Sequence, residues 1–357
     1  MLQVNWTSTA VSILHPPVDS TQQATAQDKP AVRLPSPRAR AAATMPSDPR
    51  VSAIDNFTPT IHHAPGTTLR AAITSPLPTP YTVCIIGASR GIGAGVALSY
   101  ARAGATTLLL AARNTTQLAD VAAQISAIAP SCAVHTVACD ISSPTSVRGL
   151  AAHAATRLRA HLDAVVVNSG YSGHVELELT RGDAAADGQW AQAFAVNALG
   201  TYHAAHYLVP LLLGAPEGAG RAFVVVGSIA SCIRTGAIAN SKYCVSKMAQ
   251  VRIVEHVAEQ FGARGLLAVA VHPGAVETEM AMESAPEEFK KYLVDDPELC
   301  GHFLVWLTRE PGRFQWMNGR LLSANWDPDE LVEMKEEVVE GDLLKFEAKT
   351  SAEKVSK

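Results

Sequence analysis

The stretch Val83–Gly104, VCIIGASRGIGAGVALSYARAG, decides how this chain folds. A short apolar run typical of a buried strand leads into a glycine-rich turn, and apolar residues then recur near helical spacing until Gly104 ends the helix. Gly87, Gly91 and Gly93 have no Cβ, so backbone amides and the positive end of the helix can approach a diphosphate. The stretch therefore predicts a nucleotide-binding strand, turn and helix. The residues between these glycines are further candidates for the same site: Ser89, Arg90 and Ile92.

Strand-like and helix-like segments alternate from residue 81 onward. Such alternation is produced by parallel strands joined through right-handed helical crossovers, and near-continuous apolar strands indicate helices on both faces of the sheet. The sequence therefore predicts an α/β fold with one doubly wound parallel sheet, in a single domain over residues 81–326. Seven strands are expected, at residues 81–86, 106–112, 133–139, 163–168, 221–227, 266–272 and 319–324.

Polar residues mark where several helices begin. Asn114 opens the pattern of a capping box, and Ser143 before Pro144 is a cap followed by proline at the first helical position. Asp327 opens an acidic amphipathic helix predicted for the tail, residues 327–357. Its apolar side is expected to pack on the body of the protein or on a second subunit.

Residues 1–80 differ in composition from the rest of the chain. They hold 12 of the 21 prolines and show no sustained periodicity, which predicts a disordered N-terminal extension. Arginines suggest a transit peptide, but aspartates and prolines disfavour the amphipathic helix it would need, so an extension without function, with initiation at Met45, is the preferred interpretation. The stretch FTPTIHHAP, residues 57–65, is a candidate for docking on the body. Its adjacent His62 and His63 would face opposite sides of a strand and make a poor metal pair.

Composition excludes several classes of protein. A net charge of −4 gives no basic surface for nucleic acid, and no apolar run reaches the ~18 residues that a membrane span needs. The six cysteines are widely spaced and include no CxxC pair, which argues against a disulfide framework and against a zinc ribbon. We therefore expect a cytoplasmic protein that binds a small molecule, with no metal, nucleic acid or membrane partner.

The second predicted strand ends in AARN, and this ending bears on which nucleotide is bound. In dinucleotide folds an acidic residue about 20 positions beyond the glycines binds the ribose 2′-hydroxyl. Arg113 stands here instead, and its guanidinium suits a 2′-phosphate, to which Arg90 could add a second contact. The sequence therefore predicts NADP(H) rather than NAD(H); the alternative is that both are ordinary surface arginines.

Polar and small residues end the next two strands. Asp140 follows the third strand, where its carboxylate would accept a hydrogen bond from an adenine amino group; capping the helix that begins near Ser143 is an equally good interpretation. Asn168, Ser169 and Gly170 end the fourth strand. Their small side chains would let a cofactor pass close to the sheet.

Tyr243 and Lys247 lie in YCVSK, on a helix predicted from about residue 240 to 261. At positions i and i+4 both side chains occupy one helix face, so an ammonium can lie near a phenol. A nearby cation favours the phenolate and brings proton exchange closer to neutral pH. Of the seven tyrosines only Tyr243 has lysine at i+4, which makes this pair the candidate for proton transfer.

Two further polar residues belong to the same candidate site. Ser228 ends the strand FVVVGS, and its hydroxyl can stabilise charge developing on a substrate carbonyl oxygen. Asn197, in VNALG, is a polar residue in an apolar helix. It would hold a water that passes protons to Lys247, or it is a buried asparagine bonded only to backbone.

Seven features occur along the chain in this order: GASRGIG, Asp140, NSG, VNALG, GS, YCVSK and HPG. In this combination the chain resembles the short-chain dehydrogenase/reductase family over about residues 82–325. The resemblance implies a single Rossmann-type domain with a seven-stranded parallel sheet, which forms dimers or tetramers. It also implies a catalytic set of four residues: Asn197, Ser228, Tyr243 and Lys247.

The resemblance also implies roles. In that family the tyrosine acts as acid or base, the serine orients the carbonyl, and the lysine lowers the tyrosine pKa and holds the nicotinamide ribose. The expected activity is hydride transfer between NADP(H) and a ketone, aldehyde or secondary alcohol. The segment after the sixth strand resembles the one that contacts the nicotinamide amide; its candidate residues are Pro273, Gly274, Val276 and Thr278.

One departure from the family pattern leaves the identity of the serine open. Ser228 precedes Tyr243 by 15 residues, about two more than usual, and Ser231 precedes it by 12. Ser228 is preferred because it directly ends the strand, and the loop CIRTGAIANSK can absorb the extra length. Ile86 and Val167 also depart from the pattern, at positions that look structural.

The substrate is indicated only broadly. Residues 275–310 form the stretch that closes over substrate in this family, and the ending NGRLLSANWDPDEL looks like oxidoreductases of fungal secondary metabolism. Two other classes stay open: a non-catalytic NADP(H)-binding regulatory protein, and a hydrolase using Ser228, although GSIAS lacks the GxSxG elbow. The stretch offers an apolar wall, for which helix packing is the alternative: Met280, Met282, Phe289, Tyr292 and Leu293.

Overall fold

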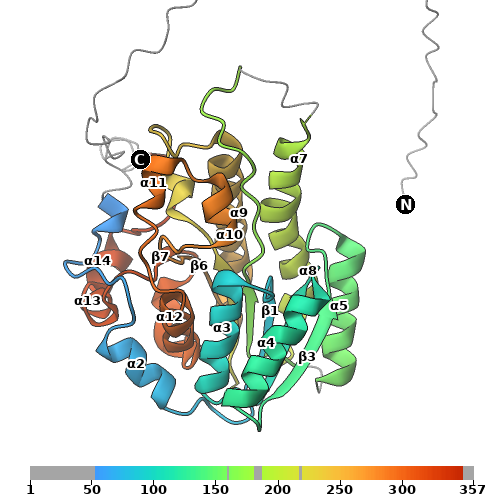
Figure 1. The fold of residues 1–357 in the computed structure, drawn as a ribbon. Coiled ribbons are helices and arrows are strands. Elements are labelled where there is room, and N and C mark those ends of the chain that lie inside the picture. The colour runs from blue at the N-terminus through green and yellow to red at the C-terminus, as the bar shows by residue number, and fades with distance from the viewer. Residues whose placement is uncertain (1–52, 159–160, 181–186, 217–218, 349–357) are drawn as a thin grey trace, which may run out of the picture. The chain divides into compact units, whose positions relative to one another are not determined.

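The computed structural model of the protein describes residues 53–158, 161–180, 187–216 and 219–348. Seven parallel strands form one sheet in the order β3-β2-β1-β4-β5-β6-β7 (Figure 1). Every strand expected from the sequence is present, with bounds that differ by two residues or fewer. The strands are β1 (Thr82–Ile86), β2 (Thr107–Ala112), β3 (Ala133–Ala138), β4 (Ala164–Val167), β5 (Ala222–Val226), β6 (Leu267–His272) and β7 (Leu321–Ser323).

Helices cover both faces of the sheet, as predicted. Because side chains alternate along a strand, Val83 and Ile85 of β1 face one helical layer while Cys84 and Ile86 face the other. The first layer consists of α3 (Gly91–Arg102), α4 (Thr115–Ile128) and α12 (Leu299–Thr308). The second consists of α5 (Pro144–Arg157), α8 (Gly200–Leu213) and α9 (Ser241–Phe261). The result is the predicted doubly wound α/β fold.

Shorter elements connect these layers. They are α7 (Gln189–Ala193), the π-helix η1 (Phe194–Leu199), η2 (Ile229–Cys232), η3 (Gly262–Arg264), α10 (Glu279–Ser284), α11 (Glu287–Lys290) and η4 (Pro311–Met317). Two of the predicted helix caps are confirmed: Asn114 Oδ1 accepts from Gln117 N at 3.1 Å, and Ser143 Oγ accepts from Ser146 N at 3.3 Å.

The strand order places a crevice next to β1. Ile86, the last residue of β1, pairs with Ala111 of β2 on one side and with Val167 of β4 on the other. The chain leaves β1 and β4 toward opposite faces of the sheet, so a crevice opens outside the carboxyl ends of these strands. The glycine turn that follows β1 lies in this crevice.

The N-terminal boundary differs from the prediction. Residues 53–80 were expected to be disordered, but α2 (Thr67–Thr74) buries Leu69, Ala72 and Ile73 against the body. Prediction of disorder fails here because scattered apolar residues meet partners that lie far away in the sequence. Residues 1–52, including the proposed start at Met45, lie outside the described residues.

The C-terminal tail also differs in detail. Two short helices, α13 (Pro328–Glu333) and α14 (Lys335–Glu340), replace the single helix expected over residues 327–357. Asp327 caps α13 as predicted, accepting from the backbone of Asp329 and Glu330. The apolar side packs on the body, since Leu331 and Val338 are fully buried. Residues 349–357 lie outside the described residues.

The structure also bears on the cysteines and on membrane association. None of the six cysteines forms a disulfide bond, and five of them are buried. Within the described ranges, no helix is both long and apolar enough to cross a bilayer.

Candidate functional site

The glycine turn between β1 and α3 has no room for a Cβ at Gly87 or Gly93. Gly87 has φ +90°, and a Cβ there would lie 2.6 Å from Ser169 N. A Cβ on Gly93 would lie 2.0 Å from Gly87 O and 2.5 Å from Asn168 Nδ2, which donates to Gly87 O at 2.9 Å. Gly91 is exposed at the first turn of α3. The turn therefore brings backbone and a helix N-terminus to the surface of the crevice, which suits a diphosphate.

A cavity of about 520 Å³ lies over this turn at the carboxyl ends of the strands. The structure brings most of the predicted cofactor residues to it. These are Gly87, Ser89, Arg90, Gly91, Ile92, Arg113, Asp140, Asn168, Gly170, Tyr243, Lys247, Pro273 and Thr278. Gly93 lies beneath the turn, and Gly274 and Val276 line a neighbouring cavity instead.

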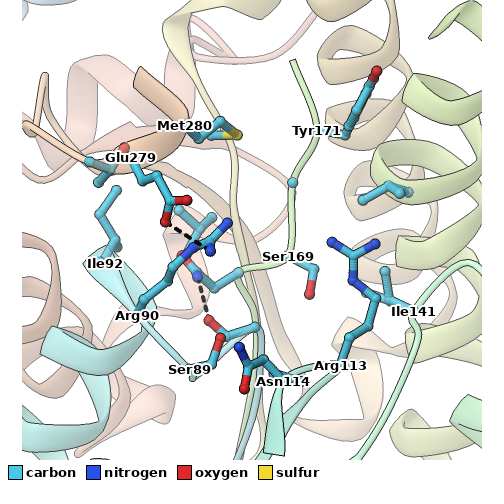
Figure 2. Close-up of a pocket in the computed structure, with 18 of the residues that line it drawn as sticks. Ser89, Arg90, Ile92, Arg113, Asn114, Ile141, Ser169, Tyr171, Glu279 and Met280 are labelled. Carbon is cyan, nitrogen blue, oxygen red and sulfur yellow. Dashed lines mark hydrogen bonds and ion pairs between the residues drawn. The ribbon is translucent and has the colours of Figure 1, made fainter. Parts of the chain in front are cut away.

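The two candidate phosphate-binding arginines occupy different sides of the cavity. Figure 2 shows Arg113 beside Ile141, whereas Arg90 lies across from it and pairs with Glu279 at 2.8 Å. Arg113 is exposed and lies near enough to Asp140 for its charge to lower the pKa of that carboxyl. Arg113 is thus an exposed cation at the cavity wall, while Arg90 already has a carboxylate partner.

Asp140 does not cap the helix after β3. That cap is Ser143, whereas Asp140 Oδ1 accepts from Ser142 N at 2.9 Å and from Ser142 Oγ at 2.7 Å. These hydrogen bonds, led by the one from the Ser142 hydroxyl, lower the pKa of Asp140. The capping interpretation is therefore wrong, and an ionised carboxylate lines the cavity.

Tyr243 lies where the first cavity meets the second, and it lines both. Burial raises the pKa of Tyr243 to about 12, and a hydrogen bond with the Ser228 side chain opposes that rise. The sequence predicted a phenol pKa lowered by Lys247, whose Nζ lies 5.8 Å from the ring centroid. In this structure the net shift is upward because loss of hydration outweighs the favourable contacts, so the phenol is protonated at neutral pH.

Ser228 and Ser231 have different surroundings. Ser228 lines the second cavity and contacts Tyr243. Ser231 Oγ donates to the backbone oxygen of Ser228 at 2.7 Å. The geometry therefore favours Ser228 as the hydroxyl that meets a bound molecule.

Lys247 is buried in a network of neutral groups. Its Nζ donates to Val226 O at 3.0 Å and to Gln250 Oε1 at 2.9 Å. Gln250 Nε2 donates to Thr201 Oγ1 at 2.8 Å, and Thr201 Oγ1 donates to Asn197 O at 2.8 Å. Burial lowers the pKa of Lys247 to about 7, so a modest change in its surroundings alters its charge near neutral pH.

Asn197 lies behind the cavity rather than in it. It is fully buried in the π-helix η1, where its Nδ2 donates to Tyr171 O and to Ser246 Oγ, both at 2.9 Å, and its Oδ1 accepts from Tyr171 N at 2.9 Å. Its side chain thus bonds to a hydroxyl as well as to backbone. A π-turn often marks a functional site, and here it directs the Asn197 carbonyl toward the network that reaches Lys247.

The second cavity has a volume of about 210 Å³ and is mostly apolar. Its walls come from the loop after β5 and from the segment between β6 and α12. Three of the five residues proposed as an apolar wall line it, namely Met280, Phe289 and Leu293. Met282 and Tyr292 do not line it and are partly exposed.

Two residues of the site were missed from the sequence. Gln250 accepts from Lys247, and Asp295 accepts from the backbone of Ala275 beside the second cavity. Gln250 could have been predicted, since a polar side chain three positions after Lys247 lies on the same face of a buried helix. Asp295 could not have been predicted, because its partners are far away in the sequence.

Comparison with known proteins agrees with this geometry. The family model of the short chain dehydrogenases matches residues 81–288. The short chain dehydrogenase mpl6 of Monascus purpureus is 40% identical over 74% of this chain and 87% of its own length. The short chain dehydrogenase pgmD of Aspergillus terreus is 34% identical over 82% of this chain and 93% of its own length.

Solved structures share the fold. A 7α-hydroxysteroid dehydrogenase complexed with NADH and 7-oxo glycochenodeoxycholic acid has a TM-score of 0.60 at 20% identity, covering 71% of this chain and 96% of its own. Pseudomonas aeruginosa RhlG, solved with NADP, has a TM-score of 0.58 at 22% identity, covering 71% and 96%. The chain therefore belongs to the short-chain dehydrogenase/reductase family, whose members are oxidoreductases that bind a nicotinamide cofactor.

Proposed function

We propose that this protein is an NADP(H)-dependent oxidoreductase that transfers a hydride between nicotinamide and a ketone, aldehyde or secondary alcohol, with Tyr243 as general acid or base. The observation that carries the proposal is the position of Tyr243. Its side chain lines both cavities, contacts Ser228 and shares a helix face with Lys247. A phenol at the junction of a nucleotide cavity and an apolar cavity can exchange a proton with a molecule held in the second.

The first cavity suits a dinucleotide. The backbone of the glycine turn and the first turn of α3 would bind the diphosphate, and Asp140 would accept from the adenine amino group. Asn168 and Gly170 would leave room for the cofactor to pass close to the end of β4. Further contacts to the cofactor would come from Ser89, Ile92, Pro273, Gly274, Val276 and Thr278.

The preference for NADP(H) rests on Arg113. Its guanidinium is exposed at the cavity wall and suits a phosphate on the adenosine ribose. Arg90 would join it only by giving up its pair with Glu279, in which both side chains are about half exposed. We therefore assign the larger share of the selectivity to Arg113.

The chemistry requires one proton and one hydride. The reduced nicotinamide supplies the hydride to the carbonyl carbon when bound. Tyr243, protonated because its pKa is raised to about 12, would give its proton to the carbonyl oxygen while Ser228 donates a hydrogen bond to that oxygen. For alcohol oxidation the two residues would act in reverse.

Lys247 and Asn197 would support the proton transfer. With a pKa of about 7, Lys247 is close to balance between its two charge states, and its ammonium form favours the Tyr243 phenolate. A bound ribose would give Lys247 further acceptors. Asn197 would set the position of Lys247 through Thr201 and Gln250.

The second cavity supports a small, largely apolar substrate. Its lining includes Ile229, Ile233 and Ile238 beside the wall from α10 and α11. Desolvation in such a site favours a neutral carbonyl compound over a charged one. Together with the named fungal relatives, this supports a substrate from secondary metabolism.

The proposal extends to location and assembly. Cysteines without disulfide bonds fit a reducing compartment, and we place the enzyme in the cytoplasm. Exposed apolar side chains on α8 and α9, Tyr202 and Met248 among them, support a homodimer or homotetramer.

Tyr243→Phe tests the mechanism. The variant removes only the hydroxyl, so turnover of a carbonyl substrate with NADPH should fall by about 10²- to 10⁴-fold, while NADPH affinity measured by nicotinamide fluorescence stays within about twofold. The matched control is Tyr202→Phe, a tyrosine on α8 outside both cavities. Full turnover in Tyr243→Phe would remove Tyr243 from the mechanism. NADPH binding by the wild type without turnover across a broad carbonyl panel would favour a regulatory protein.

A further inference from the structure

The backbone turn after β6 is held by one buried carboxylate. Asp295 Oδ2 accepts from Ala275 N at 2.5 Å, and Asp295 N donates to Ala275 O at 3.1 Å. Val276 and Asp295 also form an isolated parallel bridge. Gly274, with φ +94°, lies so close that a Cβ there would come within 2.6 Å of Asp295 Oδ2. The turn therefore has its position set by this side chain.

Asp295 is held by residues from both ends of the chain. Its Oδ1 pairs with His63 Nδ1 at 2.6 Å, and its Oδ2 accepts from Asn325 Nδ2 at 3.0 Å. The backbone of Asp296 donates to His63 O at 2.8 Å. The Asp295 side chain is 4% exposed, while that of His63 is 65% exposed. The carboxylate thus links an outer segment of the protein to the wall of the second cavity.

That outer segment, residues 53–66, is here called the N-terminal arm. It is fastened to the start of the C-terminal tail: Ile61 forms an antiparallel bridge with Trp326, and His62 Nε2 pairs with Asp327 Oδ2 at 2.8 Å. Figure 1 shows the blue start of the described chain beside α13 and α14. The arm is therefore anchored independently of Asp295, and can act as a fixed support for it.

We propose that Asp295 is a positioning residue that fixes the Pro273–Val276 turn for the nicotinamide half of the cofactor, and that the N-terminal arm, through His63, holds Asp295 in place. The inference rests on the proposed function, because the turn is assigned to nicotinamide there. It adds a requirement of this chain's own: residues before the first strand of the sheet take part in ordering the active site.

The geometry makes the effect specific to one half of the cofactor. Asp295 binds the backbone of Ala275 in the turn between the cavities. Arg113 lies beside Ile141, across the first cavity from Arg90 and Glu279 (Figure 2). A ligand that carries the adenosine 2′-phosphate but no nicotinamide, such as adenosine 2′,5′-bisphosphate, should be insensitive to Asp295. NADPH should be sensitive to it.

The first test compares Asp295→Ala with Asp295→Asn. Alanine leaves Ala275 N without its acceptor, so NADPH affinity should fall by roughly 10-fold and kcat by roughly 10²-fold, since the nicotinamide is misplaced. Affinity for adenosine 2′,5′-bisphosphate should stay within about twofold. Asparagine can still accept from Ala275 N and Asn325 Nδ2 and donate to His63, so it should restore NADPH affinity to within about threefold of wild type.

The second test uses neighbouring histidines of the N-terminal arm and covers the case in which Asp295→Ala does not fold. His63→Ala removes the contact with Asp295 and should lower kcat by about fivefold with no change in binding of adenosine 2′,5′-bisphosphate. His62→Ala, which removes a similar pair with Asp327 on the same segment, should leave kcat unchanged. Equal losses in the two variants would mean that the arm contributes only general stability, and would overturn the proposal.

The outcomes separate this inference from the proposed function. If the wild type binds neither NADPH nor adenosine 2′,5′-bisphosphate, both are wrong. If the wild type binds both and Asp295→Ala weakens both ligands equally, or neither, or if His63→Ala leaves kcat unchanged, only the positioning role is overturned. Loss confined to NADPH and kcat supports it.

Discussion

Lys242 and Lys247 are both buried on α9, five residues apart, yet they have opposite kinds of partner. Lys242 Nζ pairs with Glu176 Oε2 at 3.2 Å, and Trp190 Nε1 donates to the same oxygen at 3.1 Å. Lys247 Nζ donates only to an amide oxygen and a backbone carbonyl, and among the described residues it forms no ion pair with a carboxylate.

The two kinds of partner indicate different roles on one helix: a structural role for Lys242 and a chemical role for Lys247. A buried lysine paired with a carboxylate fixes the loop that carries its partner, and this is the arrangement of Lys242. An ammonium among neutral acceptors bears an uncompensated desolvation cost, and the pKa of Lys247 falls to about 7. The arrangement of Lys247 lowers the stability of the fold, but the charge of this lysine can change when a ligand binds. A catalytic site needs such a group.

The largest expected effect is a difference in kcat between variants of the two lysines. Lys247→Met should lower kcat with NADPH by about 10²- to 10⁴-fold, because the Tyr243 phenolate loses its cation. Lys242→Met should keep kcat within about threefold, provided that assays are run well below its melting temperature. Steady-state kinetics on the two variants decide this, and similar losses in both would contradict the distinction.

The next effect appears in folding stability. Lys242→Met leaves Glu176, whose side chain is only 15% exposed, with the Trp190 hydrogen bond but no cation, so the free energy of unfolding should fall by about 2 kcal/mol. Urea titration at pH 7 measures the change. A double variant with Glu176→Leu should recover part of the loss; no recovery would mean that the two side chains are not coupled.

A third effect lies in how stability depends on pH. Because the folded-state pKa of Lys247 is about 7, below the 10.5 of an unperturbed lysine, the folded protein loses this proton between pH 7 and 10.5 while the unfolded chain keeps it. Stability should therefore rise from pH 7 to 9 by up to ~1.4 kcal/mol per pH unit relative to Lys247→Met. Below pH 7 the difference should level off, since both states bind the proton. Parallel curves for wild type and variant would contradict the depressed pKa.

The smallest expected effect comes from making Lys247 resemble Lys242. Gln250→Glu places a carboxylate where Gln250 Oε1 now accepts from Lys247 at 2.9 Å. An opposite charge raises the lysine pKa, so the rise in stability between pH 7 and 9 should shrink, and kcat should change by about fivefold or less. Gln250→Leu serves as the control, for which the rise should begin at lower pH.

Much of the fold was readable because its determinants are local. The turn glycines and the caps at Asn114 and Ser143 act within a few residues, so strand, turn and helix follow from the order of residue types. The alternation of strands and helices then fixes the doubly wound sheet. Docking of residues 57–65 on the body was a candidate, and the bridge between Ile61 and Trp326 agrees with it. The helix α2 escaped prediction because its partners lie far away in the sequence, and composition alone indicates disorder there.

The site was readable in part for the same reason. Tyr243 and Lys247 share one helix turn, and the residues of the glycine turn are consecutive. The sequence could not decide between Ser228 and Ser231, since both follow the same strand. Only the structure shows that the Ser231 hydroxyl donates to the backbone while Ser228 lines the second cavity. Asp295 was invisible because its role depends on contacts to His63, 232 residues away.

The most direct test of the account is cofactor binding by the purified protein, with NADPH and NADH measured side by side by nicotinamide fluorescence and thermal shift, in the wild type and in Arg113→Ala. The account predicts that NADPH binds the wild type at least about 10-fold more tightly than NADH, since a charge-assisted contact to the 2′-phosphate is worth about 1.5 kcal/mol or more, and that Arg113→Ala removes most of that preference. Equal affinities for NADPH and NADH in the wild type would contradict the assignment of Arg113. Binding of neither nucleotide would contradict the site itself.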